Sequence, residues 1–267
     1  FTALGIPTVK DEEWKYTSLS GLTRLKFEMA TETTVVELSA LKAYRGDGNI
    51  NLVFVNGNYS AALSNVNNIP LGITVTTLKD ALVSNEQGVK SLMTRYRVED
   101  EAAFVALNEA LSNSGAYIET QANTVHKGLV HIIHVTSSNH KEIVTMPRTL
   151  INLGRSSEIT VLESHIAFTD TITYFANALT DIFLAENAVL HYCKAQKESL
   201  KAYHIGHTRV WQERNSDLDG FALITGGKLT RNEVDCVLNG EGGNATINAL
   251  YSVYKDQHVD NHTSVDH

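Results

Sequence analysis

The chain has 267 residues, a formal net charge of −8 and a pI near 5.8. This length can bury a sizeable core in one large domain or two smaller ones. The acidic balance, without any basic run, argues against nucleic acid and anionic membrane surfaces as partners. No apolar run approaches the ~20 residues of a membrane helix, and two cysteines cannot build a disulfide framework. The expected location is a reducing cytoplasm.

The first 115 residues predict a small α/β domain. An acidic turn runs into Trp14 and Tyr16, which predicts a short helical segment of an N-terminal arm anchored by the two rings. Residues 52–55 predict a strand that turns back at Asn56-Gly57, because this pair readily takes the positive φ angles of a tight hairpin.

Helical signals follow before the expected end of this domain. Residues 73–75 predict another strand, and Thr77 is placed to cap the helical turn behind it. Apolar residues then recur at helical spacing and predict one or two amphipathic helices within 85–111. These residues are Val89, Leu92, Met93, Tyr96, Phe104, Leu107 and Leu111. Gly115 marks the expected boundary, so that the first domain covers 1–115.

The second half predicts a parallel β-helix over residues 116–267. Segments 157–162, 186–191 and 243–248 each join a polar turn to a β-rich run with a large aliphatic residue in the same column. Those residues, Val161, Leu190 and Ile247, are 29 and then 57 residues apart. Such a recurrence indicates stacked units that bury one another's apolar columns, and about 28 residues suit one coil of two or three strands.

The ends of the chain lead us to expect a fragment. The sequence begins with Phe1 rather than Met and stops at His267 in a strand-like pattern, without a polar or helical cap. A β-helix needs such a cap, since an open end is an aggregating edge.

Two glycine-rich stretches match nucleotide-binding motifs only formally. Residues 240–245 fit G-x-G-x-x-[GA], but the sequence behind them has strand character where that motif requires a helix. Gly226-Gly227-Lys228 lacks the Ser or Thr that would bind magnesium, because Leu229 follows. Both stretches are interpreted as turns.

His258, Asp260 and His262 form the sharpest local pattern. On a strand they share one face, and two imidazoles with a carboxylate can bind zinc or iron(II). The alternative is a polar ladder whose side chains satisfy one another or contact a partner. We predict that they hold no metal in the isolated chain, and the metal ligands of the protein, if any, stay unknown.

No catalytic or cofactor-binding residue is assigned from the sequence. Cys193 and Cys236 are expected to pack as small apolar residues. Glu163 and Glu186 could act as the two carboxyl groups of a glycosidase only at a suitable distance from each other, and the sequence does not give that distance.

Six stretches, in order along the chain, resemble the SufB/SufD family, the β-helical scaffold subunits of the Suf iron–sulfur cluster assembly machine. They are DEEWKYT (11–17), PRTLI (147–151), TVLES (160–164), GGKLTRN (226–232), LNGEG (238–242) ahead of Tyr251, and QHVDNHT (257–263). The chain looks more like SufD than SufB.

This resemblance implies a fold, partners and a role. The fold would be an N-terminal α/β domain, a right-handed parallel β-helix and a C-terminal helical domain. The protein would be no enzyme but a scaffold that acts with a SufB-like subunit and a SufC-like ABC-type ATPase, or with a second copy of itself. The nascent cluster would form on SufB. The cysteine and histidine of the SufB–SufD interface, and the helical domain that docks SufC, would lie beyond His267, so residues 1–267 alone are expected not to bind SufC.

A second hypothesis comes from another class of protein. A stand-alone metal-dependent or glycan-binding β-helix would use the His258, Asp260 and His262 face as its site. The few aromatic residues and the absence of an export signal favour the scaffold. Copurification with sister subunits separates the two hypotheses.

Overall fold

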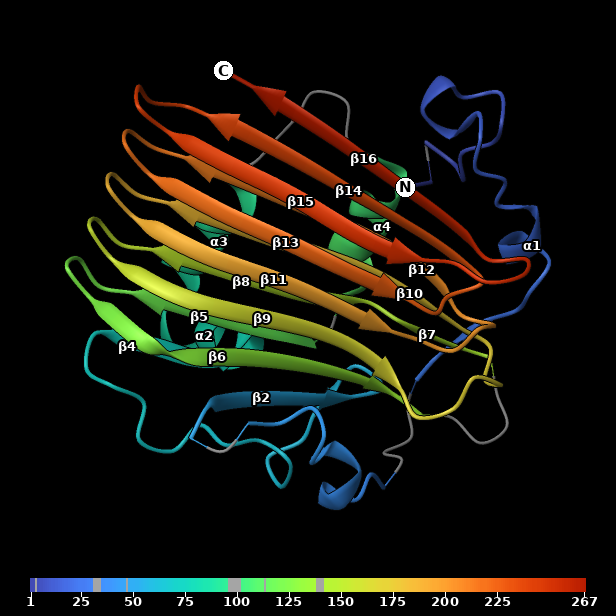
Figure 1. The fold of residues 1–267 in the computed structure, drawn as a ribbon, viewed down its shortest axis with the longest axis horizontal. Helices are drawn as coiled ribbons and strands as arrows, with labels where there is room; N and C mark the ends of the chain where they lie inside the picture. The colour runs from blue at the N-terminus through green and yellow to red at the C-terminus, as the bar shows by residue number, and fades with distance from the viewer. Residues whose placement is uncertain (3, 31–34, 47, 96–101, 113, 138–141) are drawn as a thin grey trace.

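The computed structural model describes residues 1–2, 4–30, 35–46, 48–95, 102–112, 114–137 and 142–267. Over these residues the chain forms a β-solenoid of about five coils, preceded by a smaller N-terminal region. Figure 1 shows the strands stacked from β2 (Ile50–Val55) and β6 (Val125–Thr136) at one end to β15 (Asn244–Ser252) and β16 (His258–Asp266) at the other. The predicted parallel β-helix is confirmed.

Two sheets enclose the lumen of the β-helix, and from β8 onward successive strands alternate between them. Sheet A has the order β16-β14-β12-β10-β8-β5-β4, with β7 beside β10 and β1 beside β7, and sheet B has the order β15-β13-β11-β9-β6-β2-β3. All these pairs are parallel except β4–β5 and β2–β3. The remaining strands of sheet A are β1 (Glu28–Met29), β4 (Ile73–Thr77), β5 (Ser114–Thr120), β7 (Ile143–Thr145), β8 (Pro147–Leu153), β10 (Tyr174–Leu184), β12 (Tyr203–Gln212) and β14 (Leu229–Leu238). Those of sheet B are β3 (Asn58–Tyr59), β9 (Glu158–Ala167), β11 (Val189–Lys197) and β13 (Asp217–Thr225).

The turns from sheet A to sheet B stack like the strands they join. In each turn one residue takes a positive φ of 55–73°, namely Asn123, Ser156, Asn187, Asn215 and Gly242. Asparagine and glycine tolerate this region best. The backbone N–H of each of the first four donates to a carbonyl of the next turn, as from Asn187 to Arg214 at 3.0 Å. The ladder of hydrogen bonds thus continues around the corner of every coil.

The three residues that carried the repeat point into the lumen as predicted, but their column needs a correction. Val161, Leu190 and Ile247 belong to or pack against one apolar core and lie on β9, β11 and β15. Leu190 faces Ile159, whereas Val161 faces Tyr192, in the column that reaches Ile247 two strands later. A shift of two residues keeps a side chain on the same face, so the pattern indicated the face but not the register.

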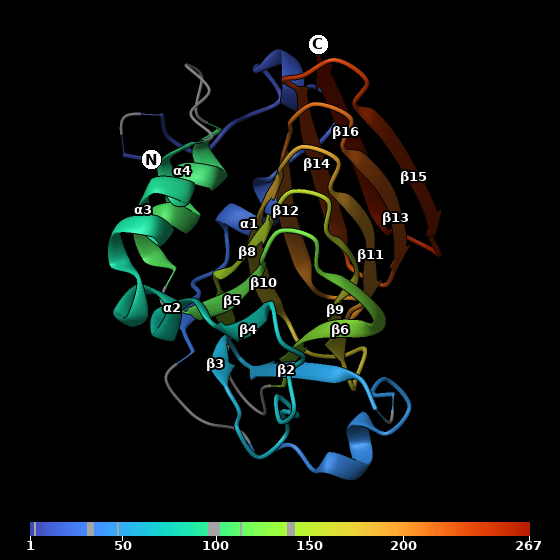
Figure 2. The same cartoon turned by 90° about the vertical axis from the view of Figure 1, so that its left-hand side faces the viewer.

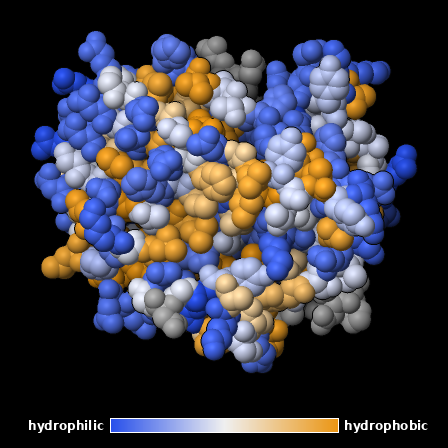
Figure 3. Space-filling view, viewed as in Figure 1, coloured by the Kyte–Doolittle hydropathy of each residue, from blue (hydrophilic) through white to orange (hydrophobic). Residues whose placement is uncertain are grey.

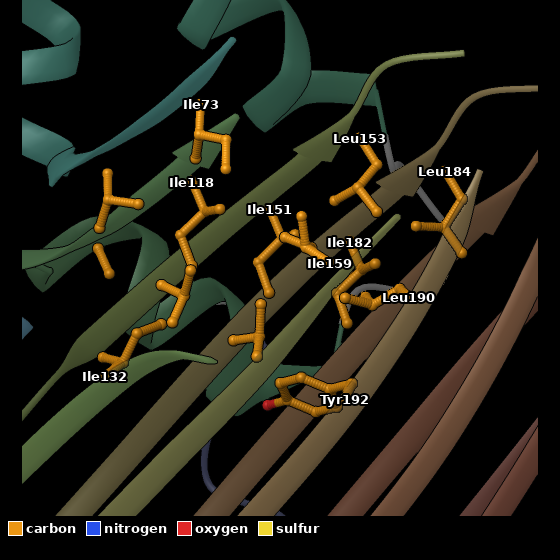
Figure 4. Close-up of a cluster of buried hydrophobic side chains, with 14 of the residues drawn as sticks. Ile73, Ile118, Ile132, Ile151, Leu153, Ile159, Ile182, Leu184, Leu190 and Tyr192 are labelled. Atoms are coloured by element: carbon orange, nitrogen blue, oxygen red, sulfur yellow. The ribbon is translucent and has the colours of Figure 1, made fainter. Parts of the chain in front are cut away.

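The apolar core fills the half of the lumen next to the turns that lead from sheet A to sheet B. Figure 4 shows its side chains meeting between the sheets, among them Ile118, Ile151 and Ile182 from sheet A and Ile132 and Leu190 from sheet B. All five are fully buried. At roughly 25 cal/mol per Å² of apolar surface, this column is the main source of stability of the solenoid.

The helices cover the outer face of sheet A, as Figure 2 shows. They are α1 (Ser20–Thr23), α2 (Leu78–Ser84), α3 (Glu86–Arg95) and α4 (Ala103–Leu111), together with a single 3₁₀ turn at Glu12–Trp14. A second 3₁₀ turn, Leu38–Leu41, packs its Leu41 against residues of β2, β6 and β9 in sheet B. The predicted helices of 85–111 are confirmed, except that Tyr96 lies outside the described residues. Thr77 accepts a hydrogen bond from the backbone N–H of Asp80 at 3.1 Å, so the predicted cap is confirmed. Asn56 and Gly57 have φ of 50° and 80° in the predicted hairpin.

Core packing continues across the expected domain boundary at Gly115. Strand β2 pairs with β6, and its Leu52 and Phe54 belong to the same apolar cluster as Ile118. The division into 1–115 and 116–267 stays a prediction. On the outer face of sheet B, Figure 3 shows polar and apolar patches side by side, with Phe221 and Leu250 among the exposed residues. No helix among the described residues is long and apolar enough to cross a membrane.

Candidate functional site

The other half of the lumen is polar. Along β9 the inward positions change from Ile159 and Val161 to Glu163 and His165, all nearly inaccessible to solvent. On β11 the same change occurs after Leu190, where Tyr192, Lys194 and Gln196 follow. Alternation on the strand keeps every second residue inside, so these groups lie within the β-helix rather than on its surface.

Glu163 is the centre of this polar half. Its side chain is 1% exposed. Thr149 donates a hydrogen bond to Oε1 at 2.9 Å, while Thr180 and Tyr192 donate to Oε2 at 3.0 and 2.6 Å. Three hydroxyl donors from three strands fix the orientation of the carboxylate and compensate its burial.

Two histidines approach the same carboxylate. His134 Nε2 lies 3.3 Å and His165 Nε2 3.7 Å from Glu163 Oε1, and neither nitrogen makes a well-aligned hydrogen bond. The rings form a stack in which Phe54 and His134 are 5.2 Å apart, and His134 and His165 4.8 Å. His204 closes the row edge-on at 4.9 Å from His165. Among the described residues, His134, Glu163 and His165 form the group whose possible metal-ligand atoms lie within 4.8 Å of one another.

A second carboxylate lies farther along the lumen. Glu198 accepts hydrogen bonds from Tyr174 at 3.0 Å and from Gln196 at 2.9 Å, and its Oε2 is 3.0 Å from His204 Nδ1. Lys194 Nζ donates to Asn232 at 2.9 Å. The chain therefore buries two acids, a base and several amides in one connected network, which is a costly arrangement for a purely structural core.

Burial and mutual contact shift the pKa values of these groups apart. Burial opposes the charge of Glu163, but the close approach of His134 and His165 outweighs it and holds its pKa well below the ordinary value. Burial also lowers the pKa of His165 to about 3. For Glu198 burial is outweighed by His204, and its pKa falls to about 2. At neutral pH the lumen thus contains carboxylates beside the uncharged imidazole of His165, an arrangement that can accept a cation.

The residues singled out on β16 lie elsewhere, on the outside of the β-helix. His258, Asp260 and His262 share a face as predicted, and they hold the N-terminal arm. Thr17 Oγ1 lies 3.0 Å from His258 Nε2 and donates to Asp260 Oδ2 at 2.5 Å. His262 Nδ1 is 3.2 Å from a carboxylate oxygen of Glu13. That these residues bind no metal stays a prediction.

The arm is anchored by its tryptophan. Trp14 is buried, and the Arg231 guanidinium carbon lies 4.1 Å from the centroid of its ring. Arg231 also forms ion pairs with Asp260 and Glu233. A cleft of about 910 Å³ opens beside the arm, but its charged lining is paired internally, as Arg231 and His207 illustrate. The predicted role of Trp14 as an anchor is confirmed, but Tyr16 is 83% exposed, so the prediction that its ring also anchors the arm is wrong.

The cysteines and Glu186 form no site with the lumenal groups. Cys236 lies in the apolar core, where burial raises its pKa to about 11, and it packs as predicted. Cys193 lies on the outward-facing side of β11, and partial burial raises its pKa as well. Glu186 is exposed in a turn opposite Arg214, whereas Glu163 is in the lumen, so nothing supports a glycosidase pair.

Sequence reasoning missed the lumenal cluster as a site. Glu163 and His134 were visible as polar residues in apolar strands, but only the stacking of β6 on β9 brings them together. The sequence did contain one signal. Glu163 and His165 follow Ile159 and Val161 at steps of two residues along the strand, so all four side chains lie on the same, inward face.

Comparisons with known proteins agree with this architecture. Residues 1–132 match the family described as SufBD protein N-terminal region, and residues 133–267 match SUF system FeS cluster assembly, SufBD core domain. An iron–sulfur cluster assembly SufBD family protein of Synechocystis is 26% identical over 98% of this chain and 60% of its own length. The iron–sulfur cluster assembly protein SufD of Escherichia coli is 28% identical over 98% and 59%. SufB of Bacillus subtilis is 24% identical over 71% and 40%.

Fold and matches together define the class of protein, a β-helical member of one family. The chain belongs to the SufBD family. It spans about 60% of the length of the first two relatives.

Proposed function

We propose that this chain serves in Suf iron–sulfur cluster assembly as part of a non-catalytic, SufD-like scaffold subunit. It would act with a SufB-like subunit and an ABC-type ATPase of the SufC kind. The observation that carries the proposal is the continuous match of residues 1–267 to the two SufBD family regions, together with the alignment of E. coli SufD over 98% of the chain.

The chemistry of the described residues supports a scaffold over an enzyme. Thiolates are the usual protein ligands of iron–sulfur clusters, yet burial raises the pKa of both Cys193 and Cys236. One thiol lies on the outer face of sheet B and the other in the lumen, so they do not form a paired site. The cluster, as the cargo of the system, would therefore find no pair of thiolate ligands within the described part of residues 1–267.

Copurification from the native host tests the proposal. The full-length gene, tagged at its own locus, should bring down a second SufBD family protein and an ABC-type ATPase in comparable amounts. Deleting the gene should lower the activity of iron–sulfur enzymes under iron limitation, while iron-independent enzymes serve as the control.

The opposite result is equally clear. If the tagged protein purifies without an ATPase or sister subunit, and the deletion leaves iron–sulfur enzymes untouched, the scaffold assignment is wrong. Retention on immobilised glycans would then favour the stand-alone β-helix.

A further inference from the structure

The polar lumen has a feature that a scaffold role does not require. Imidazole nitrogens of His134 and His165 converge on one oxygen of Glu163, deep inside the β-helix. The side chains of the three residues are 8%, 4% and 1% exposed. Both Nε2 atoms are buried without a well-aligned hydrogen-bond partner. Buried polar atoms are normally satisfied, so two orphaned nitrogens aimed at one carboxylate point to an absent ligand.

We propose that His134 Nε2, His165 Nε2 and the Glu163 carboxylate bind a divalent transition-metal ion, of the zinc or iron(II) class, in the lumen of the β-helix. The ion would connect β6 to β9, and its remaining positions would be filled by water. This inference is independent of the proposed function.

The ligand types and spacing suit such an ion. Two histidines and one carboxylate form a frequent three-ligand set of zinc and non-haem iron. Metal–ligand bonds of about 2.0–2.2 Å in a tetrahedral site place ligand atoms about 3.3–3.5 Å apart. The distances from Glu163 Oε1 to the two nitrogens, 3.3 and 3.7 Å, are already close to this value. No pair in the group exceeds 4.8 Å, so small side-chain rotations would complete the site.

The surroundings hold these ligands in place. Strand pairing puts His134 directly opposite His165, and the two rings stack at an interplanar angle of 20°. Thr149, Thr180 and Tyr192 orient the carboxylate by hydrogen bonds. Such an outer shell is what tunes metal ligands in proteins, and here it comes from β8, β10 and β11.

Charge and access also agree with a cation. Lys194 is buried in the same part of the described lumen and interacts electrostatically with Glu163 and Glu198, so these two acids outnumber the one buried lysine there. A cavity of about 70 Å³, partly lined by Tyr192 and Lys194, opens toward the last coils. It has room for several waters, and Tyr192 in turn contacts Glu163. The cavity thus ends one side chain away from the site, at Tyr192.

Cobalt(II) is a suitable probe, because it occupies zinc sites and absorbs visibly there. Protein stripped by a chelator and titrated with Co²⁺ should bind one ion per chain with the intense bands of a low-coordinate site, and Zn²⁺ should displace it. Melting temperature should rise with Zn²⁺ concentration, since an ion that binds only the folded state stabilises it. X-ray absorption of the zinc-loaded wild type should show nitrogen and oxygen neighbours at about 2.0–2.1 Å.

Matched variants then locate the site. Glu163→Gln keeps the size and shape of the side chain but removes its charge, and His165→Gln removes one imidazole ligand. Each should weaken Co²⁺ binding at least about 100-fold, because changes to residues that only hydrogen-bond the ligands already cost 10–100-fold. Thr180→Val should show such an intermediate loss. The control, His258→Gln with His262→Gln on the outer face, should bind as the wild type does. Circular dichroism establishes that each variant is folded.

Several results would overturn the proposal. The first is wild-type protein that binds no stoichiometric Co²⁺ or Zn²⁺ and whose melting temperature does not change with zinc. The second is sulfur neighbours at about 2.3 Å in the X-ray absorption spectrum. The third is metal binding that is lost in the outer-face control but kept in Glu163→Gln. The wild-type measurements decide the matter even if a lumenal variant fails to fold.

Discussion

Truncation of Leu190 to alanine tests whether the lumen is the source of stability. Leu190 is fully buried, with Ile159 and Leu218 directly beside it in the neighbouring coils. Leu→Ala in a core costs about 2–5 kcal/mol, and the cost grows with the cavity that remains. Both sheets are tied by continuous parallel ladders on either side of Leu190, so the walls cannot close in. We therefore expect the upper part of that range, about 3–5 kcal/mol.

Urea unfolding followed by circular dichroism measures this loss. The midpoint should fall while the slope stays constant, because the surface exposed on unfolding hardly changes. Leu250→Ala is the control, since Leu250 is 58% exposed on β15 and should change stability by no more than about 0.5 kcal/mol. If the loss of unfolding free energy in Leu190→Ala is as small as in this control, packing in the lumen is not the source of stability.

Two further predictions concern buried charges. Burial opposes protonation of His207, but hydrogen bonds to Asp235 and Glu233 outweigh it and raise its pKa to about 9. Because this is above the unfolded value of 6.5, the protonated His207 stabilises the fold by on the order of 3 kcal/mol below pH 6.5, and this contribution is lost as pH rises through 9. In His207→Gln, the free energy of unfolding measured in urea should therefore fall less between pH 6.5 and 9 than in the wild type. An unchanged pH dependence would contradict the assignment. Asp181 is 1% exposed between Arg148 (2.9 Å) and Arg209 (2.6 Å). Its replacement by Asn should cost about 3–5 kcal/mol, because the two arginines then keep only the more exposed Glu109 as a counter-charge; a loss below about 1 kcal/mol in the same urea assay would refute this.

The sequence determined the architecture because that information is local. β-rich runs behind polar turns and the recurrence of about 28 residues specify coils without knowledge of distant contacts. The hairpin at Asn56-Gly57 and the cap at Thr77 are likewise properties of a few neighbouring residues. Each of these predictions is confirmed.

Register and site were beyond the sequence because they depend on which residues meet across coils. Two alignments of Leu190 that differ by two residues present the same face, and only the backbone pairing of β9 with β11 selects Ile159 as its neighbour. The same holds for function: His258, Asp260 and His262 are adjacent in sequence and merely hold the N-terminal arm, whereas His134 and Glu163 are 29 residues apart and converge. Local spacing reveals which face a side chain occupies, but the stacking of coils alone decides what it faces there.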